Sequence, residues 1–247
     1  MFNGKRFIIA AAMVLWVTMI HICVPCNLAI AQTAKDWAQF GRYHENNRQI
    51  KAQANEINSQ MVIFLGNSIT EQWEKLHPEF FAENGYIGRG ISGQTSYQML
   101  LRFREDVINL SPKVVIINAG TNDIAENNHP YSEDITLGNI ISMCELAKIN
   151  NIKVILSSIT PCGFYIWRKD ITDAPEKIIN LNRRIAEYAK ENNILFADYF
   201  SAMAVAEGDK KGWMRDELTK DGCHPTLAGY AVMEPIIQQA INSVIER

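Results

Sequence analysis

Five short, almost wholly apolar runs are the feature that most limits what this chain can fold into. Each run is too short for a helix and has no polar face, which is the pattern of strands buried on both sides. Amphipathic helical patterns lie between them, and strands that alternate with helices form a parallel, doubly wound sheet. We therefore predict an α/β fold with strands at residues 61–65, 86–87, 114–117, 154–156 and 194–197, and helices at 97–109, 132–150, 175–192 and 225–245.

The length of 247 residues suits one well-filled domain of this kind and is too short for two of ordinary size. An amphipathic pattern over residues 36–58 predicts a helix docked on the domain surface. We accordingly divide the chain into residues 1–31, an N-terminal helical extension at 32–59, and a main domain at 60–247. The net charge of -3, with no cluster of Lys and Arg, predicts no nucleic-acid partner.

The first 31 residues have the pattern of a secretory signal peptide. Lys5 and Arg6 precede a mostly apolar run over residues 7–24, and residues 29–31 read Ala-Ile-Ala, a cleavage pattern. A membrane anchor is the alternative, but the apolar length barely permits one and His21 interrupts it. We expect an exported protein, periplasmic or extracellular, with no stable membrane insertion after signal cleavage.

The cysteines give no disulfide framework. Cys23 and Cys26 would leave with the signal peptide, so the exported chain keeps Cys144, Cys162 and Cys223, an odd number. A bridge between Cys162 and Cys223 requires their loops to meet, and that possibility stays open at this stage.

A serine follows the first predicted strand. Residues 66–70 read GNSIT, so Ser68 lies where a glycine turn leads into a helix. A hydroxyl there is exposed and close to backbone N–H groups that can stabilise an anion. Alternatively, Ser68 is only the N-cap of the helix. The stretch lacks the glycine two residues after the serine that a G-x-S-x-G nucleophile elbow requires.

Residues 88–93 read GRGISG, a formal match to the dinucleotide-binding fingerprint. That fingerprint needs an acidic residue about 20 positions on, at the end of the next strand. The strand at 114–117 is followed instead by Asn-Ala-Gly, which argues against an NAD-dependent oxidoreductase. The alternatives are a simple turn, or a backbone N–H of Gly93 that donates to a developing oxyanion.

A polar loop, NAGTND at residues 118–123, follows the third of the predicted strands. The side-chain amide of Asn122 could donate to the same oxyanion as Gly93. Thr121 and Asp123 are typical turn and cap residues, so the loop is a weak signal by itself.

The stretch KDGCHP at residues 220–225 is the most specific of the four. An Asp three residues before a His can hold the imidazole Nδ1 and leave Nε2 free as a base. Asp221 and His224 are therefore candidate catalytic residues. The alternative is that Asp221 forms the turn and His224 caps the last helix.

Together and in this order, the four stretches resemble the SGNH (GDSL-type) hydrolase family over residues 60–245. The resemblance implies a flavodoxin-like three-layer α/β/α sandwich with a five-stranded parallel sheet, so that residues 60–247 form an SGNH hydrolase domain. It implies neither a metal nor an organic cofactor. Two positions depart from the family pattern: Asn67 replaces the Asp of the namesake motif, and Cys223 lies where we expect an aliphatic residue.

The resemblance also implies a role for each matched residue. Ser68 would be the nucleophile, His224 the general base and then acid, and Asp221 the residue that orients His224. The backbone N–H groups of Ser68 and Gly93 and the side chain of Asn122 would form the oxyanion hole.

The family acts on many esters, so the resemblance implies the reaction class but not the substrate. The loops around the site must determine which ester binds. Trp167 in the loop at 161–174 and Trp213 in the loop at 208–220 could stack on a sugar ring, with Arg168 binding its polar groups. Alternatively, these residues could only cover the sheet edge. We expect an esterase for short acyl groups, above all acetyl, whose partner is a small ester or acylated carbohydrate. The alternative is a non-catalytic carbohydrate-binding protein on the same fold.

Overall fold

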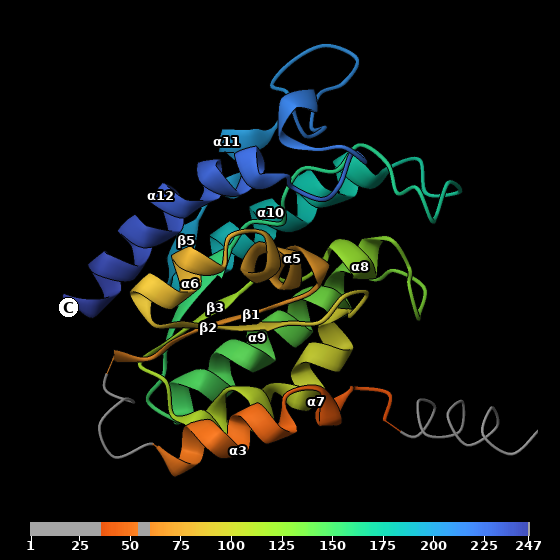
Figure 1. Ribbon diagram of the computed structural model, residues 1–247. Coiled ribbons are helices and arrows are strands. Elements are labelled where there is room, and N and C mark those ends of the chain that lie inside the picture. Colours follow the sequence, from red (N-terminus) through yellow and green to blue (C-terminus); the bar gives the residue numbers. More distant parts are fainter. Residues whose placement is uncertain (1–35, 54–59, 247) are drawn as a thin grey trace, which may run out of the picture.

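Five parallel strands form one sheet in the order β2-β1-β3-β4-β5 (Figure 1). The computed structural model describes residues 36–53 and 60–246. The predicted signal peptide at 1–31 lies outside the described residues. The strands are β1 (Val62–Gly66), β2 (Tyr86–Gly90), β3 (Val114–Ile117), β4 (Lys153–Ser157) and β5 (Leu195–Ala197).

Alternate side chains of the strands build two cores, one on each face of the sheet. In β1, Val62 and Phe64 belong to one core, and Ile63 and Leu65 belong to the other. Helices α5 (Ser68–Leu76), α6 (Pro78–Asn84), α11 (Tyr199–Met203) and α12 (Leu227–Ile245) cover the first face. Helices α7 (Ser96–Asp106), α9 (Glu133–Ile149) and α10 (Ala174–Glu191) cover the second. The result is the predicted three-layer α/β/α sandwich, with α12 and α9 on opposite sides of the sheet in Figure 1.

The sequence predicted all five strands, and β3 has the predicted bounds. Strand β2 is longer than predicted because residues 88–90 also pair with β1, although they lack an apolar pattern. The glycines in this part of the strand allow helix α5 to approach closely. A Cβ atom on Gly90 would meet the backbone nitrogen of Glu71 at 2.2 Å. The first half of the GRGISG stretch is therefore strand in contact with a helix, which accounts for these glycines without a dinucleotide.

The predicted N-terminal helix at 36–58 is wrong in its extent. The segment forms a short 3-10 helix, η1 (Phe40–Arg42), and then α3 (His44–Ala52), while residues 54–59 lie outside the described residues. The Asp36 carboxylate accepts the backbone N–H groups of Phe40 and Gly41 at 2.8 and 2.9 Å. These bonds close a turn ahead of α3 and compete with a continuous helix.

The N-terminal segment is attached by buried polar contacts. Asn47 donates its amide to Asp106 of α7 at 2.7 Å and accepts from Arg89 of β2. The Tyr43 hydroxyl donates to the carbonyl oxygen of Gly90, and Gln94 donates to that of Ala38 at 2.9 Å. Residues 36–52 thus brace the end of β2, directly before the predicted oxyanion loop.

The remaining described elements are short: η3 (Ile108–Leu110), α8 (Thr121–Ile124) and η4 (Asp216–Leu218). None of the helices in the described ranges combines the length and apolar character that crossing a bilayer requires.

Candidate active site

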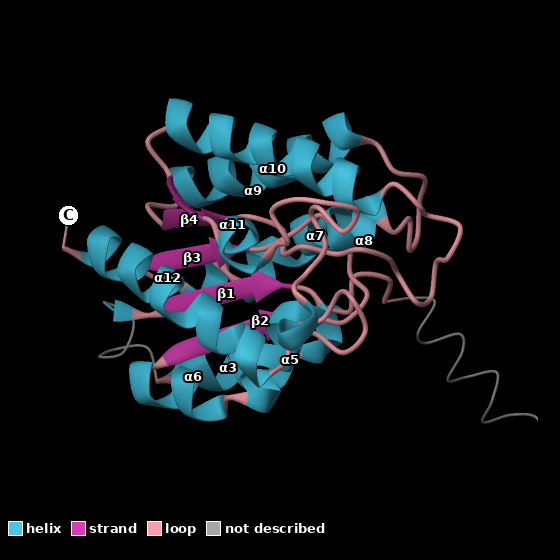
Figure 2. Ribbon diagram, turned by 90° about the horizontal axis from the view of Figure 1, so that it is seen from above, coloured by secondary structure: helices cyan, strands magenta, loops and turns pink. Residues whose placement is uncertain are grey.

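The four stretches singled out in the sequence lie at one end of the sheet. The loops after β1, β2 and β3 leave its carboxyl edge, toward which the strand arrows point in Figure 2. The backbone N–H of Ile91 donates to Gly66 at 3.2 Å, and that of Asn118 donates to Leu65 at 3.0 Å. In doubly wound sheets, this edge beside the strand-order reversal is where active sites form.

Ser68 is the first residue of α5, and Asn67 is its N-cap. The Asn67 side-chain oxygen accepts the Ile69 N–H at 2.9 Å, so capping is done by Asn67 and the reading of Ser68 as only a cap is wrong. An Asp would accept the same bond, which is why Asn can stand in the place of the family's Asp. The Ser68 Oγ lies 2.9 Å from Nε2 of His224.

A tight turn holds Asp221 against His224. One Asp221 carboxylate oxygen accepts the backbone N–H groups of Cys223 and His224 at 3.0 and 2.8 Å. The other lies 2.7 Å from Nδ1 of His224. Thr219 donates its hydroxyl to the His224 carbonyl at 2.8 Å, which closes the turn. An unbroken hydrogen-bonded chain therefore runs from Asp221 through the imidazole to the hydroxyl of Ser68.

The same contacts set the charge of Asp221. Burial alone would raise the pKa of its carboxyl, but the backbone N–H and imidazole of His224 and the backbone N–H of Cys223 hold that pKa below its usual value. Asp221 is therefore ionised at neutral pH. An ionised partner at Nδ1 favours the tautomer in which Nε2 accepts a proton.

The candidate oxyanion donors come from three loops. Gly93 has φ +79, a left-handed conformation that favours glycine, and its backbone is exposed. Neither the Ser68 nor the Gly93 N–H has an acceptor among the described residues. Asn122 is 2% exposed and donates one amide hydrogen to the Gln94 carbonyl at 2.9 Å, which leaves its second hydrogen available.

Two buried charged residues behind these loops were missed by the sequence reasoning. Arg102, fully buried, donates to the carbonyl oxygens of Gly66 and Arg89 at 3.0 and 2.9 Å and pairs with Asp106. It thereby ties the ends of β1 and β2 together. An Arg within an amphipathic helix is normally expected on the solvent-exposed face, so the sequence carried no signal for its burial.

Glu71 of α5 holds the residue next to Gly93. Its carboxylate accepts both the backbone N–H and the hydroxyl of Ser92. Burial would raise its pKa, but the Lys75 ammonium and these Ser92 donors lower it to about 2. The charged form of Glu71 therefore fixes the Gly93 loop over α5.

The three residues proposed for the substrate rim have different surroundings. The Trp167 ring lies 5.8 Å from the His224 ring and is 40% exposed, beside the hydrogen-bonded chain. Trp213 packs against Phe164 with ring centroids 5.6 Å apart. All five donor hydrogens of Arg168 have protein acceptors on Ala125, Glu126 and Asp170. Its guanidinium supports the loop and leaves no donor for a sugar.

The three described cysteines are unbridged and buried. Cys162 donates its thiol to the Phe164 carbonyl at 3.2 Å, and Gly163 and Gly222 are joined by a backbone hydrogen bond of 3.2 Å. Burial, and next the neighbouring Cys223 thiol, raise the pKa of Cys162 far above its usual range. The two loops do meet, as a bridge would need, but Cys162 and Cys223 are not bridged.

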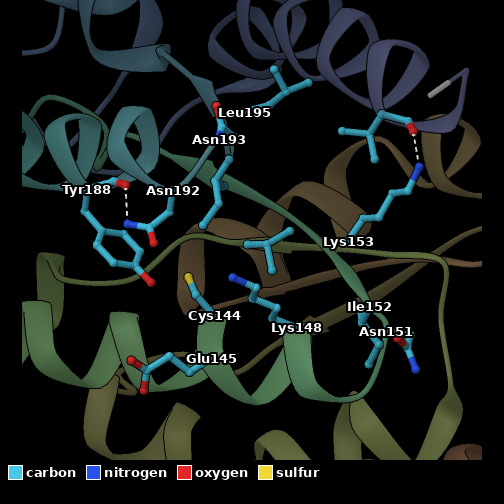
Figure 3. Close-up of a pocket in the computed structure, with 13 residues that line it drawn as sticks. Cys144, Glu145, Lys148, Asn151, Ile152, Lys153, Tyr188, Asn192, Asn193 and Leu195 are labelled. Atoms are coloured by element: carbon cyan, nitrogen blue, oxygen red, sulfur yellow. Dashed lines mark hydrogen bonds between the residues drawn. The ribbon is translucent and has the colours of Figure 1, made fainter.

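A cavity of about 590 Å³ lies at the opposite, amino end of β4 and β5 (Figure 3). Cys144, Lys148, Lys153 and Tyr188 are among the residues around it. No serine or histidine of the described chain lines it, and the Lys153 ammonium is already bound to the Val244 carbonyl at 2.9 Å. We therefore place the site at the carboxyl edge. The described residues contain no cluster of His, Cys, Asp and Glu suited to a metal ion.

Residues 64–232 match the GDSL-like lipase/acylhydrolase family. The chain belongs to that family. A GDSL-like lipase from Bacteroides thetaiotaomicron VPI-5482 is 55% identical, with a TM-score of 0.80 over 84% of this chain and 99% of that chain. An acetyl xylan esterase structure is 25% identical, with a TM-score of 0.60 over 73% of this chain and 98% of that chain.

A curated relative of this acylhydrolase is the platelet-activating factor acetylhydrolase IB subunit beta homolog of Drosophila melanogaster. It is 26% identical over 153 residues, 59% of this chain and 60% of that relative. The family resemblance, the fold and the ester-hydrolase class predicted from the sequence are thus confirmed. This acylhydrolase is an enzyme that hydrolyses esters.

Proposed function

We propose that this acylhydrolase is an exported serine esterase that removes short acyl groups, above all acetyl, from carbohydrate esters. The observation that carries the proposal is the chain of contacts from Ser68 Oγ to His224 Nε2, 2.9 Å, and from Nδ1 to Asp221, 2.7 Å. A serine hydroxyl is a weak nucleophile at neutral pH until a positioned base takes its proton. A non-catalytic binding protein has no need for such a chain.

In the proposed mechanism, His224 Nε2 takes the hydroxyl proton as Ser68 Oγ attacks the ester carbonyl carbon. The tetrahedral intermediate then loses the sugar alkoxide, which receives the proton from the imidazolium. His224 then takes a proton from water as the water oxygen attacks the acyl-serine carbonyl. The imidazolium returns this proton to Ser68 Oγ as the C–O bond to serine breaks and the carboxylic acid leaves. Asp221 stays ionised throughout and stabilises the imidazolium.

The negative charge that develops on the carbonyl oxygen needs donors that are already in place. We assign this role to the backbone N–H groups of Ser68 and Gly93 and to the free amide hydrogen of Asn122. Removing one such donor typically costs about 2.7–4 kcal/mol of transition-state stabilisation.

Two observations support a carbohydrate ester as the substrate. The exposed Trp167 indole beside His224 offers a flat apolar surface on which a sugar ring can stack. An acetyl xylan esterase and an acetylhydrolase homolog are among the proteins to which this chain is similar. We therefore assign an acetylated carbohydrate as the substrate. Arg168 is not part of the proposed binding surface, because its donor hydrogens are already bound to protein oxygens.

Export rests on the sequence pattern of residues 1–31, with the enzyme starting near Gln32. On this proposal residues 32–59 are an N-terminal extension and 60–247 the hydrolase domain. Mass spectrometry of the protein recovered from the periplasm or medium would show the predicted start. Retention of residues 1–31 would contradict it.

The function is tested by hydrolysis of p-nitrophenyl acetate, butyrate and palmitate, and by acetate release from acetylated xylan. We expect rates to fall with chain length and to vanish in Ser68→Ala. Ser201→Ala is the matched control, because Ser201 is an exposed serine that bonds only within its own turn with Asp198. Equal inactivity of wild type and Ser68→Ala on every ester, with retained glycan binding, would favour the binding-protein alternative.

A further inference from the structure

Asn127 joins parts of the site that lie on separate loops. Its side-chain nitrogen donates to the carbonyl oxygen of Gly93 at 3.2 Å and to the side-chain oxygen of Asn122 at 3.0 Å. Its side-chain oxygen accepts the Trp167 indole N–H at 2.9 Å. One side chain therefore contacts two of the three loops that carry candidate oxyanion donors, together with the aromatic ring beside His224.

The contact with Asn122 decides which way that amide faces. An amide has one oxygen and two N–H hydrogens in a plane. Asn127 occupies the oxygen, and the Gln94 carbonyl occupies one hydrogen at 2.9 Å. Because the group is planar, these two bonds fix the direction of the remaining hydrogen. If the amide turned over, its oxygen would face the Gln94 carbonyl and its nitrogen would face the Asn127 nitrogen, so both contacts would become repulsive.

The backbone brings Asn127 back over Asn122. Helix α8 ends in a Schellman turn, in which the Asn127 N–H bonds to the Asn122 carbonyl at 3.1 Å and the Glu126 N–H bonds to that of Asp123 at 2.9 Å. Glu126 takes the left-handed position with φ 52. Arg168 donates to the carbonyl oxygens of Ala125 and Glu126 at 2.8 and 2.7 Å, which explains why its guanidinium is fully engaged.

We infer that Asn127 is a positioning residue for the oxyanion donors, and that the turn at 125–127 with Arg168 holds it in place. The inference rests on the proposed function. Asn127 orients the Asn122 amide and the Gly93 loop before the substrate arrives, and it connects both to Trp167 at the rim. Preorganised donors stabilise the transition state more than the bound ester, so the effect of Asn127 falls on kcat rather than on KM.

Asn127→Asp tests this role with nearly unchanged side-chain volume. The carboxylate still accepts from Trp167, but it has no hydrogen to donate and faces two oxygen atoms, those of Gly93 and Asn122. We expect kcat for p-nitrophenyl acetate to fall about 10- to 100-fold, less than complete loss of a donor, with KM within about threefold of wild type. Asn127→Ala, which removes the bonds without adding charge, should lower kcat less.

Asn128→Asp is the matched control because it makes the same change one residue along the same loop. The Asn128 amide donates to Gln98 at 2.7 Å and its oxygen accepts from Thr95 at 3.2 Å, and its side chain forms no hydrogen bond with Asn122 or Gly93. Its kcat should stay within about twofold of wild type. Titration of reactive Ser68 with an organophosphonate ester counts active sites, so a loss of folded protein cannot pass for a loss of kcat.

The result that overturns the inference is an Asn127→Asp kcat within about twofold of wild type, or an equal fall in Asn128→Asp. A rise in KM with kcat unchanged would also overturn it, since it would assign Asn127 to substrate binding. Ser68→Ala in the same assay distinguishes a failure of the proposed function from a failure of the role given to Asn127. If Ser68→Ala keeps wild-type activity, the proposed function fails; if it is inactive while Asn127→Asp is unaffected, only this inference fails.

Discussion

Among the residues that the structure describes, two aspartate–histidine pairs have different surroundings. In one, Asp221 holds Nδ1 of His224 at 2.7 Å and Nε2 lies 2.9 Å from the Ser68 hydroxyl. In the other, His129 turns Nε2 toward Asp123 at 3.6 Å, an ion-pair distance, and Nδ1 toward the Pro130 carbonyl at 2.8 Å. The His224 imidazole has one nitrogen beside a carboxylate and the other beside the Ser68 hydroxyl. Both nitrogens of His129 lie beside oxygen atoms of Asp123 and Pro130, and neither is next to a nucleophile.

The two carboxylates also do different work. Asp123 is fully buried and accepts both the backbone N–H and the hydroxyl of Ser96 at the start of α7, together with the Thr136 hydroxyl of α9. It joins two helices beneath the oxyanion loop. Asp221 is partly exposed and bonds almost only within its own turn. An aspartate beside a histidine therefore becomes a catalytic pair only when a nucleophile reaches the far nitrogen, and otherwise it builds the scaffold.

The largest expected difference between the pairs is in activity. His224→Ala should lower kcat/KM by about 10⁴-fold or more, because Ser68 loses its base. His129→Ala should keep kcat/KM within about tenfold, since no proton passes through it. Parallel kinetics of the two variants on p-nitrophenyl acetate measure this, and equal losses would remove the distinction between the pairs.

Substituting the two aspartates should separate activity from stability. Asp221→Asn should lower kcat by about 10⁴-fold because the amide favours the wrong imidazole tautomer, with little loss of stability. Asp123→Asn should destabilise the fold by about 1–3 kcal/mol, because its amide presents a donor to the buried Ser96 donors. Urea unfolding and kinetics on both variants give the two quantities. A large stability loss in Asp221→Asn would contradict the assignment.

Each of these two histidines also lies against an aromatic ring, and removing the two rings should affect substrate binding differently. The expected effect is smaller than those of the histidine and aspartate substitutions. Trp167 lies 5.8 Å from His224 and is exposed, whereas Tyr97 lies 4.0 Å from His129. Trp167→Ala should raise KM for acetylated xylan about two- to tenfold, the range of one aromatic contact. Tyr97→Ala should leave that KM unchanged. A similar KM for both variants would remove Trp167 from the substrate surface.

The smallest effect is a pH dependence of stability. The contact with Asp123, opposed by burial, raises the pKa of His129 above 6.5. The stability that protonated His129 contributes is therefore fully present below pH 6.5 and is lost as the pH rises through the raised folded value. The free energy of unfolding of wild type minus that of His129→Gln should shrink between pH ~5.5 and ~8.5. A difference that grows with pH would contradict this.

The sequence was sufficient for the sheet and for the residues of the hydrogen-bonded chain. Runs such as 114–117 identify strands because residues buried on both faces must all be apolar. Asp221 and His224 could be paired because they are three residues apart in one turn. Ser68 could be linked to them only through the family resemblance, because no spacing rule connects residues at opposite ends of a chain.

The rest depends on contacts that spacing does not encode. Arg168 was assigned to the substrate rim from its place beside Trp167, but its bonds to the carbonyls of Ala125 and Glu126 were not readable in the sequence. Asn127 gave no signal, since an Asn after a short helix is typical of any turn. The buried Arg102 likewise sits in a pattern that favours exposure. Such residues become visible only when the loops are placed side by side.

The central claim is that His224 activates Ser68, and covalent trapping tests it most directly. Protein that starts at Gln32 is incubated with diethyl p-nitrophenyl phosphate, p-nitrophenol release is followed, and the labelled residue is found by peptide mass spectrometry. Our account predicts one diethyl phosphoryl group per chain, on Ser68, with labelling in His224→Ala slower by several orders of magnitude and His129→Ala labelled as wild type. Labelling of another residue, or ester hydrolysis that persists after Ser68 is fully blocked, would contradict it.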